Sequence, residues 1–220
     1  MQKVHSWFIP EYDTHYKEYL TLNAETEYQR KPREHALEQV QQFRTAIDIG
    51  GNIGFWSKDL CERFQQVIIF EPDSSNVECL NLNLDGKDNY TLHTVGLGDI
   101  IGTRTFYKSK ITSGGHTFVK EHARHHKFTQ VSLQIHTLDS YNFTDVDFIK
   151  IDTQGSELAV LKGAVETLRG NDCVVNVEVE QKNQEQVIRG RPIFEFMDSI
   201  GYHTLKRYKR DEVLFAKRKA

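Results

Sequence analysis

The sequence predicts an α/β fold, in which a mostly parallel β-sheet is flanked by helices. Three nearly continuous apolar runs end in an acid, at Asp48, Glu71 and Asp152, as expected for parallel strands that are covered on both faces. Helical patterns separate these runs, and alternating strands and helices favour right-handed βαβ crossovers. The runs at 202–208 and 213–217 are separated only by Lys-Arg-Asp-Glu, which indicates a hairpin and therefore one antiparallel edge strand.

The individual elements follow from residue type and periodicity. Short runs rich in β-branched and aromatic residues predict strands at 46–49, 67–71, 90–95, 146–152, 173–180, 202–208 and 213–217. Apolar residues at helical spacing predict helices within 54–64, 74–84, 156–168 and 193–200. Gly201 follows the last pattern and suits a helix end.

Two segments interrupt the alternation of strands and helices. Residues 1–44 form an N-terminal cover segment, rich in aromatic and charged residues, with a helix near 33–43. Residues 45–220 form the main domain, and residues 98–143 within it are interpreted as an inserted hairpin with a loop. The aromatic and acidic residues of the cover segment suit either a structural cover or contacts with a saccharide.

Composition excludes several classes of protein. The net charge of −3 gives no general attraction to nucleic acid or to a membrane surface, so neither is expected as a partner. The three cysteines form no CxxC pair, which argues against a disulfide framework or a zinc knuckle and favours a cytoplasmic location. No apolar run approaches the roughly 20 residues that span a bilayer. A histidine-rich stretch at 116–126 is interpreted as a polar loop, so no metal site is predicted.

A glycine-rich turn follows the first of these strands. It contains Asp48, Gly50, Gly51, Asn52 and Gly54, and a helix begins directly after it. Glycine allows the main chain to approach a ligand closely, and the free amides of a helix N-terminus attract an anion. The spacing matches neither the dinucleotide motif GxGxxG nor a P-loop. Asp48 would repel a pyrophosphate but suits an ammonium group, which favours S-adenosylmethionine as the cofactor.

The ends of the next strands supply further candidate contacts. The Glu71 carboxylate can accept hydrogen bonds from both hydroxyls of an adenosine ribose. Dinucleotide-binding folds place an acid similarly, so Glu71 alone does not discriminate between the two cofactors. The Gly-Leu-Gly-Asp stretch at 96–99 could line the adenine. Asp152 is expected beside the crevice that forms where parallel strands end.

Several stretches resemble the FkbM family of class I methyltransferases. They are IDIGGNIGFWS, IIFEPDSSNVECLNLNL, VGLGD, HTLDSY and above all VDFIKIDTQGSELAVLKGA, in the family's order from Ala46 to Glu180. The resemblance implies a Rossmann-like seven-stranded sheet of order 3-2-1-4-5-7-6, with the last strand antiparallel. It also implies methyl transfer, usually to a hydroxyl oxygen of a sugar or natural product.

The resemblance carries over to individual positions of this chain. It matches Asp48, Gly50, Asn52 and Gly54 to the cofactor loop, Glu71 to the ribose acid, and Leu97, Gly98 and Asp99 to the adenine side. The cofactor-binding residues predicted for this chain also include Gly51, Pro72 and Asp152. Glu157 is a further acid of the family's signature. Two positions depart from the pattern: Gly51, where many relatives have alanine, and Gln154, where relatives usually have glutamate. Gly51 is expected only to make the turn more flexible. Gln154 means that a carboxylate which relatives have at this position is absent here.

Methylation of a sugar hydroxyl requires the removal of its proton, so a general base is expected. Asp152 is the first candidate, Glu178 on the next strand is the second, with Glu180 able to replace it, and His116 is a third. Two carboxylates on neighbouring strand ends could instead hold a divalent cation. The predicted partner is a small-molecule or saccharide acceptor, and a homodimer is one option. A nicotinamide-dependent oxidoreductase and a non-catalytic binding module are the alternatives.

Overall fold

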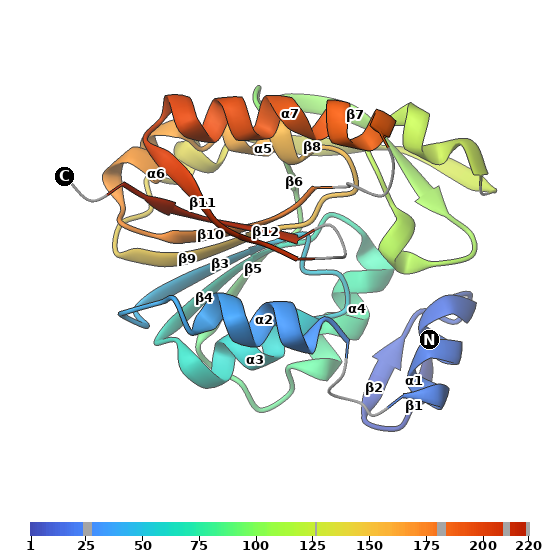
Figure 1. The fold of residues 1–220 in the computed structure, drawn as a ribbon. Helices are drawn as coiled ribbons and strands as arrows, with labels where there is room; N and C mark the ends of the chain where they lie inside the picture. The colour runs from blue at the N-terminus through green and yellow to red at the C-terminus, as the bar shows by residue number, and fades with distance from the viewer. Residues whose placement is uncertain (24–27, 126, 180–183, 209–211, 219–220) are drawn as a thin grey trace.

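The structure is a computed structural model that describes residues 1–23, 28–125, 127–179, 184–208 and 212–218. Its centre is a seven-stranded sheet (Figure 1). The strands are β3 (Thr45–Ile49), β4 (Gln66–Phe70), β5 (Tyr90–His93), β9 (Val146–Ile151), β10 (Val174–Glu178), β11 (Tyr202–Arg207) and β12 (Glu212–Lys217).

The strands lie in the order β11-β12-β10-β9-β3-β4-β5, and β12 runs antiparallel to both of its neighbours. Counted in chain order within this sheet alone, and starting from the β5 edge, the order reads 3-2-1-4-5-7-6. The predicted class of fold, a Rossmann-like and mostly parallel sheet flanked by helices, is confirmed. The Lys-Arg-Asp-Glu turn (209–212) lies almost entirely outside the described residues, as does Glu180.

Helices cover both faces of the sheet, and the alternation of side chains along each strand decides which face each residue serves. On one face are α2 (Arg30–Leu37), α3 (Phe55–Arg63) and α4 (Ser74–Asn83), which pack with Ala46, Val67 and Ile69. On the other face are α5 (Glu157–Lys162), α6 (Val165–Gly170) and α7 (Gln184–Ser199), which pack with Ile47, Ile49 and Val177. None of the described helices is long and apolar enough to cross a membrane.

The single helical pattern predicted at 156–168 forms two short helices, α5 and α6. They are separated near Gly163, where the backbone passes so close to Gly98 that a Cβ would lie 2.0 Å from the Gly98 carbonyl oxygen. The last helix is longer than predicted. It begins at Gln184 and not at residue 193, so Pro192 lies inside it.

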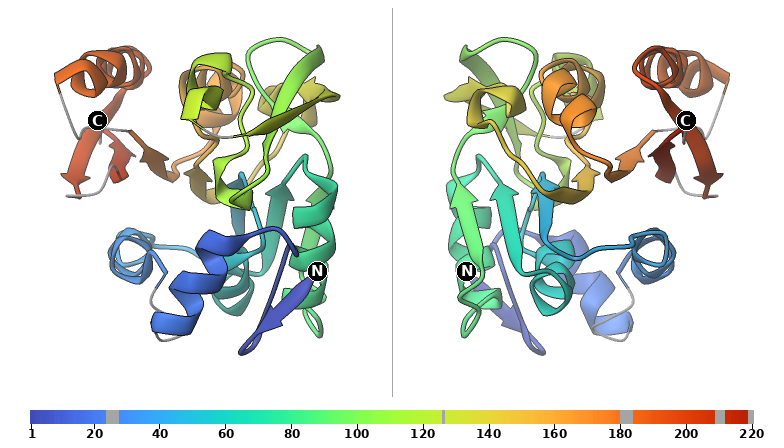
Figure 2. Two further views of the ribbon diagram at one scale, coloured as in Figure 1. Left: turned by 90° about the vertical axis from the view of Figure 1, so that its right-hand side faces the viewer. Right: turned by 90° about the vertical axis from the view of Figure 1, so that its left-hand side faces the viewer.

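Residues 1–23 pack on helices α3 and α4, whereas the insertion packs on the main sheet. The N-terminal residues form a hairpin of β1 (Gln2–Val4) and β2 (Trp7–Ile9), followed by α1 (Thr14–Leu22). The hairpin lies against α4, where the Phe8 N–H and carbonyl group both bond to the Asn83 side chain. The insertion forms a sheet of β6 (Gly96–Leu97), β8 (Phe128–His136) and β7 (Gly102–Ser109), with 3₁₀ helices at Ser113–Gly115, Lys120–His125 and Leu138–Tyr141. In the left view of Figure 2 both segments face the viewer.

Candidate active site

A cavity lies at the carboxyl ends of four neighbouring strands, β4, β3, β9 and β10. The N-terminal segment and the insertion complete its walls. Its lining includes Tyr16, Tyr28, Gly50, Asn52, Glu71, Pro72, Asn76, Leu97, Ser113, His116, Asp152, Gln154 and Glu178. The structure therefore brings most of the sequence-predicted site residues to one place, which follows from the common direction of the parallel strands.

The glycine turn approaches the next strand too closely for side chains. Gly50 has φ +81°, and a Cβ on it would lie 1.9 Å from the Asp152 carbonyl oxygen. Gly54, with φ +95°, precedes α3 in the left-handed conformation. Gly51 and Gly54 do not line the cavity, so they shape the turn from behind, whereas Gly50 and Asn52 face the cavity. The Asn52 N–H donates to Glu71 Oε2 over 2.8 Å.

Asp48 does not line the cavity. Its carboxylate is fully buried behind the turn, accepts a 2.6 Å hydrogen bond from Ser57 Oγ and pairs with Lys150 Nζ at 3.1 Å. Burial alone would lower the pKa of Lys150, but the nearby Asp48 and Asp152 carboxylates reverse this effect and raise the pKa. Lys150 also donates to the Gly50 carbonyl oxygen. Asp48 therefore stabilises the shape of the turn. Because it does not line the cavity, it is not placed for the predicted contact with a ligand ammonium group.

Glu71 is buried beneath the turn and bonded to it. Besides the Asn52 amide, its carboxylate accepts hydrogen bonds from the Asp73 N–H at 2.9 Å and from Asn76 Nδ2 at 3.4 Å. Burial raises the pKa of Glu71 to about 7, although the backbone N–H bonds oppose the shift. Glu71 is therefore a carboxylate held in a fixed orientation at the cavity wall.

The stretch predicted to lie along the adenine divides into two parts. Leu97 and Pro72 line the cavity, together with Val95 and Phe118. Gly98 is outside the cavity, and its N–H donates to the His136 carbonyl oxygen. Asp99 pairs with Arg104 at the surface over 2.7 Å and does not reach the cavity. The apolar wall thus ends at Leu97.

Asp152 and Glu178 meet across one side chain. Gln154 Nε2 donates to Asp152 Oδ1 over 2.9 Å and to Glu178 Oε2 over 2.7 Å. Burial raises the pKa of Glu178 well above its ordinary value, and the Asp152 and Glu157 charges raise it further. Glu157 does not line the cavity and accepts hydrogen bonds from the Thr153 and Gly155 N–H groups. The site thus presents two adjacent carboxyl groups that are bridged by one amide.

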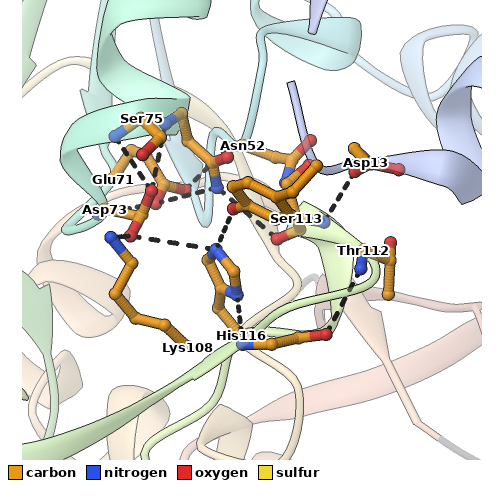
Figure 3. Close-up of polar contacts among 12 residues, drawn as sticks. Asp13, Asn52, Glu71, Asp73, Ser75, Lys108, Thr112, Ser113 and His116 are labelled. Carbon is orange, nitrogen blue, oxygen red and sulfur yellow. Dashed lines mark hydrogen bonds and ion pairs between the residues drawn. The ribbon is translucent and has the colours of Figure 1, made fainter. Parts of the chain in front are cut away.

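His116 lines the cavity, but both of its ring nitrogens are occupied. The Ser109 N–H donates to Nδ1 over 3.0 Å, so the neutral ring carries its proton on Nε2, which lies 2.9 Å from the Tyr12 hydroxyl. Burial lowers the pKa of His116 to about 4. Asp73 lies 3.8 Å from Nε2 and pairs with Lys108 at 2.6 Å (Figure 3). With no free lone pair, His116 is a poor general base, and we do not retain that hypothesis.

Two cavity residues, Asn76 and Ser113, were not predicted from the sequence. Both are buried, and the Asn76 Oδ1 and Ser113 Oγ atoms have no hydrogen-bond partner within the described residues. The Asn52 side-chain oxygen shares this property. Buried polar atoms are rarely left without a partner, so these atoms indicate a polar ligand. Ser113 stands three residues before His116, the residue of this stretch that the sequence analysis names.

A cation site is not formed by the described side chains. They contain no group of three or more His, Cys, Asp or Glu residues that could hold a metal ion. In addition, the Gln154 amide places a donor between the two carboxyl groups where a cation would need ligand oxygens.

Relatives and solved structures resemble this chain. Hexuronic acid methyltransferase AglP from Haloferax volcanii is 27% identical over 146 residues, which are 63% of this chain and 57% of the relative. The FkbM methyltransferase of Methylobacillus flagellatus KT matches with a TM-score of 0.52 and 16% identity, over 85% of this chain and 51% of that one. SMU.1697c from Streptococcus mutans, solved with SAH, matches with a TM-score of 0.54 and 11% identity, over 86% and 96% of the two chains.

The cavity fits S-adenosylmethionine. A nucleoside carrying an amino-acid end needs a close main-chain approach, an acid for its ribose and an apolar wall for its base, and these are supplied by Gly50, Glu71 and Leu97. The three unpartnered polar atoms suit the same ligand. The family described as "Methyltransferase FkbM domain" matches residues 48–204. The chain therefore belongs to the FkbM family of methyltransferases, with S-adenosylmethionine as its methyl donor.

Proposed function

We propose that this protein methylates a hydroxyl oxygen of a saccharide, a glycoside or a related natural product. The observation that carries the proposal is the pair of carboxyl groups, Asp152 and Glu178, in the cavity that fits the methyl donor. Tyr16 and Tyr28 line the same cavity, and aromatic faces beside carboxylates suit a sugar ring. The relative from Haloferax volcanii, named a hexuronic acid methyltransferase, supports this acceptor class. The family match leaves no basis for the nicotinamide alternative.

In this proposal the cofactor lies along the carboxyl ends of β3 and β4. Glu71 accepts from the ribose, Pro72 and Leu97 enclose the adenine, and the main chain at Gly50 and Asn52 borders the amino-acid end. The bound cofactor supplies an electrophilic methyl group. The acceptor then approaches from the side of Asp152, Gln154 and Glu178.

Asp152 is the proposed general base. Burial and the neighbouring Asp152 charge raise the pKa of Glu178, which favours Glu178 as the member of the pair that keeps a proton and leaves Asp152 as the candidate base. The Gln154 amide holds Asp152 Oδ1 at the cavity wall, and in this proposal the carboxylate accepts the proton of the acceptor hydroxyl. The N-terminal segment and the insertion cover part of the cavity with Tyr16, Tyr28 and Phe118, and such cover limits the access of water to the reaction.

The test is methyl transfer with S-adenosylmethionine to two acceptor sets, uronic-acid-containing saccharides and neutral ones, with products identified by mass spectrometry. We expect O-methyl ethers with wild-type protein, and a loss of turnover of about 10²-fold or more in Asp152→Asn. The affinity of that variant for S-adenosylhomocysteine should change far less. Asp99→Asn is the matched control, because Asp99 lies outside the cavity. Full turnover by Asp152→Asn would remove it as the base, and products methylated on nitrogen or carbon would contradict the acceptor class.

A further inference from the structure

The hydrogen bonds around Glu71 leave little room for a ribose. A carboxylate has about four lone-pair positions. Within the described residues three are used, two on Oε1 by the Asp73 N–H and Asn76 Nδ2, and one on Oε2 by the Asn52 N–H. One position on Oε2 is free. A ribose presents two neighbouring hydroxyls, so the second hydroxyl needs another acceptor.

Asn76 and Ser113 offer that acceptor next to Glu71. Asn76 Nδ2 donates to Glu71 Oε1 and, over 3.5 Å, to the Ser113 carbonyl oxygen. Both partners are acceptors, which fixes the orientation of the amide and leaves Asn76 Oδ1 as a buried acceptor. Asn76 is 1% and Ser113 is 2% exposed, and neither Asn76 Oδ1 nor Ser113 Oγ has a partner among the described residues.

We infer that Asn76 and Ser113 bind the second ribose hydroxyl of the methyl donor. A hydroxyl that donates to Asn76 Oδ1 and accepts from Ser113 Oγ leaves neither atom unpartnered, while Glu71 Oε2 accepts from the other hydroxyl. The ribose is thus recognised by three segments: the end of β4, the first turn of α4, and the 3₁₀ turn of the insertion. This assignment rests on the cofactor and not on the identity of the acceptor.

The N-terminal segment positions Ser113 for this role. The Ser113 N–H donates to Asp13 Oδ2 over 2.6 Å (Figure 3), and the Thr14 N–H donates to the Ile111 carbonyl oxygen over 3.2 Å. Asp13 is fully buried, and its other oxygen accepts from the Tyr16 N–H at the start of α1. Asp13 is therefore a positioning residue that fixes the serine against α4.

Isothermal titration with S-adenosylhomocysteine and its 2′-deoxy and 3′-deoxy analogues tests this inference without any acceptor. We expect Ser113→Ala to weaken binding of S-adenosylhomocysteine about tenfold. Thr112→Ala, the neighbouring hydroxyl residue outside the cavity, should bind within twofold of wild type. For the analogue that lacks the hydroxyl bound by Ser113, wild type and Ser113→Ala should bind equally. Asp13→Asn should follow the same pattern as Ser113→Ala.

Two results would overturn the inference. One is wild-type affinity of Ser113→Ala for S-adenosylhomocysteine. The other is an equal loss with all three ligands, because the serine would then act on the fold and not on a hydroxyl. Melting temperatures of the free variants show whether each is folded. A failure to find a saccharide acceptor would count against the proposed function. It would not affect the interpretation of these titrations, which contain no acceptor.

Discussion

The Lys150 ammonium nitrogen lies 3.1 Å from Asp48 Oδ1, and the two residues are direct partners in the parallel pairing of β9 with β3. Both side chains are almost fully buried. Removing one partner of such a pair leaves a buried charge, so Lys150→Met should lower the free energy of unfolding by about 3–5 kcal/mol. Denaturant titration measures the loss, and adding Asp48→Asn should recover part of it. A loss below about 1 kcal/mol would contradict the pairing.

Glu71 should make the cofactor-free protein less stable as the pH rises. Its pKa is about 7 when folded, against an ordinary value of 4.5, so the folded state binds more protons between these values. The free energy of unfolding should fall by about 3 kcal/mol from pH 4.5 to 7, relative to Glu71→Gln, and stay level above that range. Urea titrations of both proteins at several pH values measure the difference. A constant difference across this range would show that Glu71 ionises normally.

The Gln154 amide should stabilise the fold, because it donates hydrogen bonds to two carboxyl groups. Gln154→Glu adds a third acid there, so at pH 8 it should destabilise the fold by about 1–3 kcal/mol more than Gln154→Met, which removes the donor without adding charge. Near pH 4 the difference should shrink, because a protonated glutamate can donate. Thermal melts at the two pH values provide the comparison. Equal destabilisation by the two substitutions at pH 8 would show that the added negative charge does not affect stability at this position.

Gly50 should tolerate no side chain. Gly50→Ala meets the Asp152 carbonyl oxygen at 1.9 Å and also has φ +81°. Gly86 is the control, since it has φ +80° but nothing within 4 Å of a Cβ. We expect Gly86→Ala to cost roughly 1–2 kcal/mol of unfolding free energy, and Gly50→Ala more than about 3 kcal/mol. Similar losses for both would show that the turn can move away from β9.

The sequence was sufficient for the sheet and for the edge at which the site forms. Apolar runs ending in acids predict parallel strands, and the carboxyl ends of such strands lie together, so Glu71 and Asp152 were expected in one place. The position of Asp48 could not be obtained in this way, because it depends on the register of β9 against β3. Lys150 within an otherwise apolar run was the available signal, since a buried ammonium group needs a carboxylate.

The remaining parts of the site depend on contacts between distant segments. Ser113 reaches the cavity because Asp13 and Asn76 hold it there, and neither contact has a local sequence pattern. Asp99 fits the family pattern, yet Arg104 holds it at the surface. Gln154 was recognised as a departure from the pattern, but its two hydrogen bonds become visible only when β9 and β10 are paired.

Asp13 and Ser113 are 100 positions apart in the sequence, so during synthesis Asp13 is made long before its partner. At about 5–20 residues per second, roughly 5–20 seconds pass between the synthesis of the two residues. Ile9 and Leu20, which are fully buried in the finished molecule, pack in a cluster that extends to Cys79, so their core also waits for residues that are made later. We therefore expect residues 1–23 of the nascent chain to be transient clients of ribosome-associated chaperones until α4 has emerged, and to lack the Ser113 contact for longer.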